Sequence, residues 1–374
     1  MFYVTYSYKL ALISLLLFIL MIILSKPFCT YYNPQSNNVK GNISVFFWLY
    51  IISCVFAFWS ADTYHYWDEF FRAKLYTNYE MVGYEYFYNW LFTICDRNYF
   101  IWRALIFVPA GLFIFLAAKN VNLLHRNFLL AIILYAGLMA YTRGMLGHTM
   151  LLFGIILYVN RKNNNYIRFL GVILVCLSYF FHKSMYVNIA FAILAFFPFG
   201  KKSIIMSFVL YPFLTLAATY LVTRISSGDL VLALGGEGDR TVLYASGDRA
   251  IPNTIGIIGN LIKYIPEYVT LFYLCYKIEF EKCLDKEEDK ITFVYLFRLT
   301  FVSIYIASLF YFVETSSFIY TRFKYMGFFP LPFVLAKVWS LERSTNSWIK
   351  FIIIFQLLSL AFNWLVNIYT WMKL

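Results

Sequence analysis

Basic side chains at the ends of long apolar runs are the residues of this sequence most able to do chemistry. Arg143 interrupts one such run, where burial of an arginine near the middle of a span costs about 2.5–3.5 kcal/mol. Its guanidinium could snorkel to the headgroups, or it could face a polar cavity and bind an anion through two hydrogen bonds. We favour anion binding, because Arg322 and His182 are predicted to reach the same face. Arg322 and Lys324 begin another run, either as interface anchors or as a second clamp on the anion.

A histidine and a lysine separate two further apolar runs. His182 ends one run, and Lys183 stands before the next. A lone histidine at an interface is often structural, but its ordinary pKa of about 6.5 also makes it a suitable proton acceptor at neutral pH. We interpret His182 as a proton acceptor, whereas Lys183 could bind phosphate or anchor the end of a helix.

The polar segment 61–101 begins with a carboxylate among aromatic residues. Asp62 could accept hydrogen bonds from sugar hydroxyls, and the rings of Tyr64 and Tyr66 could stack on sugar faces. Tyrosine is also enriched at every membrane interface, so the rings alone do not distinguish a binding site from a membrane anchor. Glu80 belongs to the same segment and has the same two interpretations.

The acidic residues lack the spacing of a metal site. Asp62 is followed by Thr63-Tyr64, and Asp68 is followed by Glu69-Phe70, so neither begins a D-x-D or E-x-D motif. No H-E-x-x-H, P-loop or C-x-x-C pattern occurs. We therefore expect no metal ion and no cofactor.

The composition requires lipid as the solvent for the elements that carry these residues. Hydrophobic residues make up 62% of the chain and charged residues only 13%, whereas a soluble domain has about 25% charged residues. The apolar runs are continuous rather than alternating, which indicates helices and not barrel strands. The net charge of +12 is explained by orienting residues in short loops, so nucleic acid is not an expected partner.

These patterns predict an all-α, polytopic transmembrane helical bundle over residues 1–374. Two pairs of spans are short and separated only by the polar residues around Arg143 and His182, so each pair is either a hairpin or a broken, re-entrant helix. About twelve spans, some of them short, follow from the apolar runs: 8–24, 43–60, 102–118, 127–142, 144–159, 167–181, 184–199, 203–223, 258–277, 291–313, 318–338 and 349–370.

Basic residues in the short loops assign one side of the bundle to the cytoplasm. The opposite side then holds two larger loops, 61–101 and 224–257, together with Arg143, His182 and Arg322. Helical spacing of apolar residues in 61–101 predicts short amphipathic helices in the interface, and glycines make 224–257 a flexible loop. The sequence therefore predicts that the candidate residues converge on the outer face.

The ordered motifs resemble those of the EpsG family, the Wzy-type bacterial polysaccharide polymerases. The matching stretches run roughly over residues 40–340 and are Asp62-Thr63-Tyr64-His65-Tyr66, Glu80-Met81-Val82-Gly83-Tyr84, Thr142-Arg143-Gly144-Met145-Leu146, Phe181-His182-Lys183-Ser184 and Arg322-Phe323-Lys324-Tyr325.

The resemblance implies an enzyme of the bacterial cytoplasmic membrane that joins undecaprenyl-diphosphate-linked oligosaccharide units on the outer face. Arg143, Arg322 and the lysines would stabilise the diphosphate leaving group, and His182 would accept the proton of the attacking hydroxyl. Asp62 and the loop aromatics would orient the acceptor sugar. Besides the lipid bilayer, partners would be a chain-length regulator and a flippase of the same pathway.

Two other functions fit a membrane protein with these charges. A flippase or transporter of lipid-linked oligosaccharides should carry charges along a path open to both leaflets, whereas the charges here gather on one side. A ligase-like transferase would carry its histidine in a larger outer loop, and a membrane acyltransferase is the third possibility.

Overall fold

A computed structural model of the chain describes its best-determined helices and several short pieces. The described residues are 12–13, 16, 19–20, 48, 51–52, 54–55, 66–67, 69–73, 86–121, 123, 142–182, 185–198, 201–226, 289–310, 326–341, 351 and 354.

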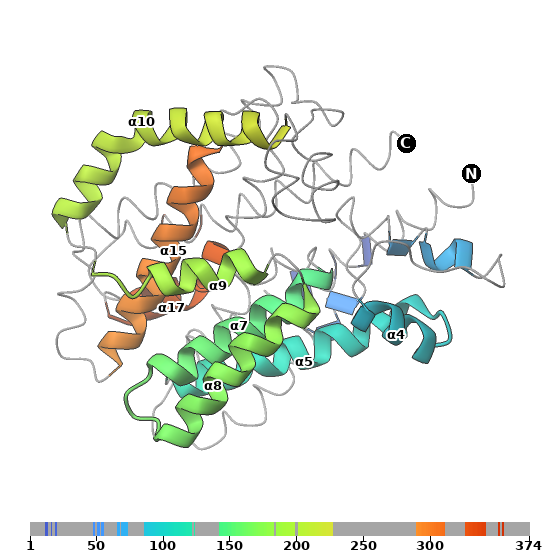
Figure 1. The fold of residues 1–374 in the computed structure, drawn as a ribbon. Coiled ribbons are helices and arrows are strands. Elements are labelled where there is room, and N and C mark those ends of the chain that lie inside the picture. The colour runs from blue at the N-terminus through green and yellow to red at the C-terminus, as the bar shows by residue number, and fades with distance from the viewer. Residues whose placement is uncertain are drawn as a thin grey trace. The chain divides into compact units, whose positions relative to one another are not determined.

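Every element with defined bounds in this part of the chain is a helix, which confirms the all-α membrane fold. In chain order these elements are α4 (Tyr86–Ile94), α5 (Tyr99–Asn120), α7 (Thr142–Val159), α8 (Asn165–Ser178), the 3-10 helix η2 (Tyr179–Phe181), α9 (Met185–Leu194), α10 (Lys201–Ser226), α15 (Lys290–Leu309) and α17 (Leu331–Leu341) (Figure 1).

Two of the described helices are both long and apolar enough to cross a bilayer, by length and composition. They are α5, with 22 residues, and α15, with 20 residues. The helices α7, α8 with η2, α9 and α10 coincide with other predicted spans but contain shorter apolar stretches. The predicted spans 127–142, 258–277 and 349–370 and the loop 224–257 lie almost wholly outside the described residues, so the number of spans stays a prediction.

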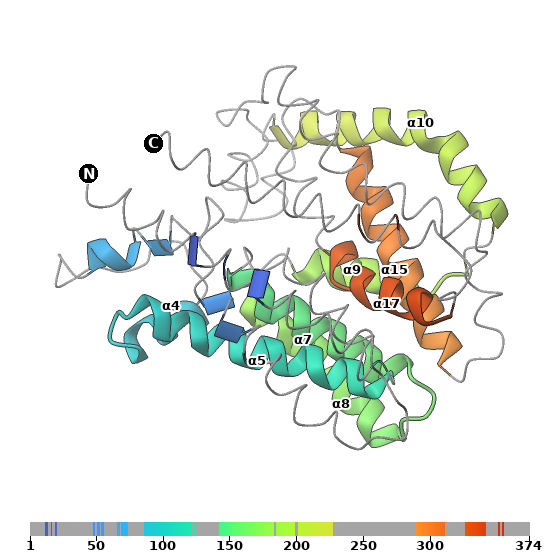
Figure 2. The ribbon, with the colours of Figure 1, turned by 180° about the vertical axis from the view of Figure 1, so that it is seen from behind.

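The chain divides into two compact units. The first contains α4, α5, α7, α8 and η2, and α7 packs against both α5 and α8 (Figures 1 and 2). Two glycines bring α7 and α8 together: a Cβ atom on Gly171 would stand 2.5 Å from the carbonyl oxygen of Gly154. No side chain fits at that distance, so glycine at both positions permits backbone-to-backbone packing.

Asparagines join α5 to the turn that follows α7. The Nδ2 atom of Asn160 donates to the backbone oxygen and to Oδ1 of Asn120, both at 2.8 Å. Asn163 donates to the Leu157 carbonyl at 2.9 Å, and Asn164 caps α8 by accepting from the Ile167 N–H at 3.0 Å. These amides satisfy backbone groups at three helix ends, those of α5, α7 and α8.

The second unit is organised around α15. The hydroxyl of Tyr295 donates to the Ala192 carbonyl of α9, and Tyr211 of α10 donates to the Ser308 carbonyl at 2.9 Å. A Cβ atom on Gly327 would lie 2.7 Å from Ile304 Cγ1, so the backbone after residue 325 also approaches α15 closely. Because α15 lies at the centre of this unit, 78% of its apolar stretch is buried.

Other helices expose apolar side chains in stripes, as lipid-facing helices do. Along α10 most described side chains are exposed, and the most exposed large apolar ones recur every three or four positions; the exposed surface of α8 is likewise apolar. The exposed fractions are 60% for Val209, 69% for Phe213, 69% for Leu216, 61% for Tyr220 and 66% for Phe169. Hydrocarbon is the environment in which such surfaces are stable.

Candidate functional site

The break at His182 exists, and it places the imidazole inside the protein. Helix α8 continues through η2 to Phe181, His182 has the extended backbone angles φ −161° and ψ 126°, and α9 begins at Met185. The N–H of Met185 donates to the His182 carbonyl at 3.0 Å, so the junction closes as a tight turn. Only 8% of His182 is exposed.

Both flanks of His182 pack against the second turn of α7. A Cβ atom on Gly147 would meet Met185 Sδ at 3.3 Å and the Ser178 carbonyl oxygen at 3.4 Å. Ser178 precedes His182 by four residues and Met185 follows it by three, and both are fully buried. Glycine at position 147 therefore lets the His182 junction lie directly on α7.

The same end of α7 carries Arg143. This residue belongs to the first turn of the helix, four positions and so about one turn before Gly147. The backbone at Arg143 thus stands one turn away from the contact that holds the His182 junction. The side chain of Arg143 lies outside the described residues.

Helix α4, from the segment 61–101, also contacts the junction. The ring of Phe87 in α4 meets the ring of Phe181 edge-on, with centroids 4.5 Å apart. Phe181 is the residue before His182. Helix α4 lies within the segment 61–101 and buries Tyr88, Leu91 and Phe92.

Tyr66 lies in a packed aromatic cluster at the beginning of α5. Its ring centroid is 5.5 Å from that of Trp102, and only 5% of the residue is exposed. Phe70 packs on the same Trp102 at 5.2 Å, and Trp67 meets Tyr99 edge-on at 5.1 Å. The Tyr66 ring is therefore enclosed by aromatic neighbours, and its stacking on a sugar stays a prediction.

The remaining candidate residues lie outside the described part of the chain. They are Asp62, Tyr64, Glu80, Lys183, Arg322 and Lys324. Their convergence with His182 therefore stays a prediction, and the structure brings together the His182 junction, the first turns of α7 and helix α4.

Two ionisable residues of this unit were not singled out in the sequence. His148 is 2% exposed, and its Nδ1 lies 2.6 Å from the Gly144 carbonyl oxygen. Because a carbonyl oxygen only accepts, this nitrogen carries the hydrogen. Arg103 is fully buried in α5. In the sequence, both residues could have been noticed as ionisable residues within apolar runs. Only tertiary contacts show that they are buried along a helix and do not merely mark a helix end.

The titration of Cys95, in the turn between α4 and α5, bears on nucleophilic chemistry. Burial raises the pKa of this thiol to about 11, and its Sγ donates to the Leu91 carbonyl. The thiolate is the nucleophilic form of cysteine, so Cys95 is unreactive at neutral pH. Among the described residues no three His, Cys, Asp or Glu side chains gather as metal ligands.

Comparison with known proteins identifies the family. The model of the EpsG family matches residues 42–374, which is most of the chain. The chain belongs to the EpsG family. EpsG-like proteins are Wzy-type polysaccharide polymerases and membrane glycosyltransferases, and the family that the motifs predicted is confirmed. Comparisons with curated proteins and with solved structures gave no match.

Proposed function

We propose that this EpsG protein polymerises undecaprenyl-diphosphate-linked oligosaccharide units on the outer face of the bacterial cytoplasmic membrane. The observation that carries the proposal is the packing of the buried His182 junction on the second turn of α7, one turn from Arg143. Helix α4 of the outer loop contacts the residue beside this histidine. The histidine that we propose as the proton acceptor, the helix turn that carries Arg143 and helix α4 thus belong to one unit.

Each group has a defined part in the proposed reaction. His182 takes the proton from a hydroxyl of the acceptor sugar, and that oxygen attacks the anomeric carbon of the donor chain. The bond between this carbon and the diphosphate oxygen breaks, and the electron pair leaves with the diphosphate. Arg143 and Arg322, with Lys183 and Lys324, stabilise the charge on the leaving group.

Acceptor recognition belongs to the outer loop. Asp62, Tyr64 and Glu80 hold the acceptor sugar in this proposal, and Tyr66 fixes the loop through its contact with Trp102. Basic side chains provide the charge that a divalent metal ion provides in metal-dependent glycosyltransferases, so the reaction proceeds without a metal. A chain-length regulator and a flippase of the same pathway are the proposed protein partners.

Turnover of a defined lipid-linked repeat unit by purified protein in proteoliposomes tests the proposal. We expect His182→Ala to lower the rate of polymer formation by about 10²–10⁴-fold, because the proton acceptor is lost. Arg143→Ala should lower it by about 10²–10³-fold through loss of leaving-group stabilisation. His125→Ala is the matched control, since the sequence places that imidazole with Arg126 on the opposite side of the membrane.

The same assay separates the alternatives. Full-length glycan from both site variants would refute the assigned chemistry. If the wild-type protein moved labelled units across the bilayer without joining them, it would be a flippase. Loss of activity in EDTA that a divalent ion restores would refute metal-independent transfer.

A further inference from the structure

Arg103 is a charged residue fully enclosed within a membrane-spanning helix. It lies in the second turn of α5, and none of its surface is exposed. Ionisable residues in spans are costly to insert and usually have a function with an identifiable partner. The contacts of Arg103 show what its charge holds in place.

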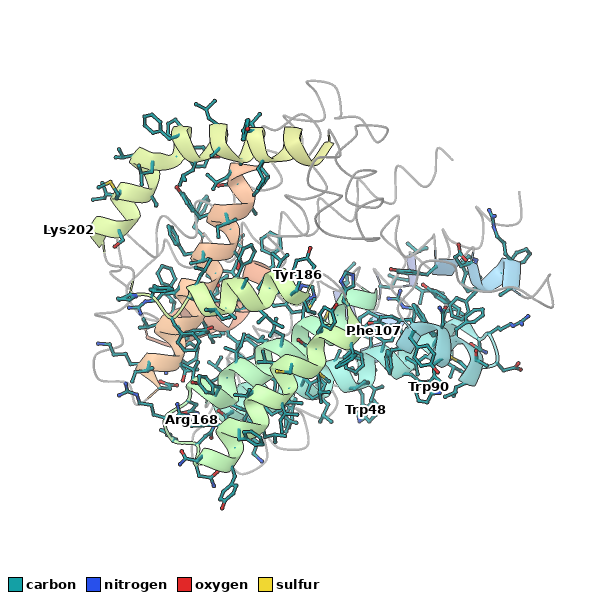
Figure 3. The ribbon with its side chains drawn as sticks, in the orientation of Figure 1. Trp48, Trp90, Phe107, Arg168, Tyr186 and Lys202 are labelled. Atoms are coloured by element: carbon teal, nitrogen blue, oxygen red, sulfur yellow. The ribbon has the colours of Figure 1, made fainter. Side chains whose placement is uncertain are left out.

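The guanidinium connects two segments that are far apart in the sequence. Its Nη1 donates to the Tyr99 hydroxyl at 3.0 Å, and its Nη2 donates to the carbonyl oxygen of Cys54, 49 residues earlier. Its Cζ lies 4.8 Å from the ring centroid of Phe107. Phe107 is labelled in Figure 3. The planar fork thus reaches a hydroxyl and a carbonyl while it stacks on a ring, which a lysine ammonium cannot do in the same way.

Two other residues of α5 contact the beginning of the segment 61–101. Trp102, adjacent to Arg103, packs on Tyr66, and Tyr99 packs on Trp67. The first two turns of α5 therefore contact the chain at two places, at Cys54 and at Tyr66. The stretch between these two contacts contains Asp62 and Tyr64.

We propose that Arg103 is the positioning residue for the acceptor-binding stretch 62–66, an inference that rests on the proposed function for the role of that stretch. Arg103 does not itself bind the diphosphate, because it is enclosed by Tyr99, Phe107 and the Cys54 backbone. It acts through the backbone that it holds. Loss of the Arg103 contacts should weaken acceptor binding and leave the proton transfer at His182 unchanged.

Arg103→Lys is the central variant, because it keeps the charge and removes the fork. We expect KM for the acceptor unit to rise about tenfold, with kcat within about twofold and the pH profile unchanged. Tyr99→Phe removes one partner of the guanidinium and should act in the same direction with a smaller effect, about threefold. It also serves as the test if Arg103→Lys does not yield folded protein.

Thr300→Val is the matched control for loss of a buried hydrogen bond. The Thr300 hydroxyl donates to the Leu296 carbonyl at 2.9 Å within α15, a helix that has no part in the proposed reaction. We expect no change in KM or kcat from this substitution. Combining Arg103→Lys with Asp62→Asn should give less than the product of the separate effects, because both act on one binding event.

A readout without turnover separates this inference from the proposed function. Thr63→Cys introduces a thiol whose labelling by a membrane-impermeant maleimide reports the local placement of the stretch. We expect the labelling rate to change at least about threefold in Arg103→Lys and to stay constant in Thr300→Val. Unchanged labelling and KM in both Arg103→Lys and Tyr99→Phe would overturn the inference. Changed labelling in a protein that does not polymerise would sustain the inference and refute the proposed function.

Discussion

The two ends of helix α7 are built from different polar groups. At the C-terminal end, Asn160 and Asn163 bond with Asn120 of α5 and with backbone carbonyls. At the N-terminal end, the first turn holds Arg143, and His148 bonds back to the Gly144 carbonyl. Amides satisfy one another without a proton or a charge to exchange, so the first arrangement locks helices together.

Histidine and arginine can change their interactions with a ligand, and such groups are retained in a membrane protein where they function. The groups that join the helices and the groups that we propose for the reaction therefore lie at different ends of one helix. The close contact of Gly154 with Gly171 in the middle of α7 belongs to the locked part, whereas the Gly147 contact beside His182 belongs to the reactive part. The following predictions test this division.

The largest effect on stability is expected at the middle contact. Gly171→Val would place a Cβ atom 2.5 Å from a backbone oxygen that cannot move aside. Overpacking of this kind costs about 1–3 kcal/mol or more, so folded protein recovered in detergent should fall sharply. A normal yield and a normal unfolding midpoint would show that α7 and α8 are not locked there.

A smaller loss of stability is expected from Asn160→Ala. The substitution removes the donor to the part-buried carbonyl oxygen of Asn120, whereas Asn120 Oδ1 keeps the Asn163 amide at 3.3 Å. We therefore expect a cost of about 0.5–1.5 kcal/mol. Chemical denaturation of the solubilised protein measures the loss. Polymerisation per folded molecule should equal that of the wild type; a decrease as large as that of His182→Ala would contradict the separation of the two ends.

Gly147→Ala should show the reverse pattern. The added methyl group would meet the flexible Met185 side chain at 3.3 Å, so the unfolding free energy should change by less than about 1 kcal/mol. Displacement of Met185 shifts the turn at His182, so kcat should decrease several-fold. Met185→Ala in the same protein makes room for the methyl group and should restore part of the rate. Equal rates for the wild type and Gly147→Ala would show that the contact does not position His182.

The smallest expected effect concerns the turn between α4 and α5. Because burial raises the pKa of the Cys95 thiol to about 11, the thiol stays protonated at pH 8. At that pH, maleimide should not label Cys95 in the folded protein. The labelled product should form only after denaturation. Mass spectrometry of tryptic peptides locates the label. Rapid labelling in the native state would show that the outer loop does not pack as described.

The apolar runs were sufficient to predict an all-helical membrane protein, and the ordered set of five motifs from Asp62 to Tyr325 predicted the EpsG family. They also predicted the helix break at His182, because a polar residue between two apolar runs marks a junction. These features depend on residue type and spacing along the chain, which is information that the sequence carries directly.

Tertiary structure alone decided which residues meet. Nothing in the spacing of Arg103 and Cys54 indicates that a guanidinium bonds to a carbonyl 49 residues away. The same holds for Phe87 and Phe181, and for the burial of the Tyr66 ring that the sequence offered as a sugar platform. Periodicity states which residues share a face of a helix, but only packing between helices determines what that face contacts.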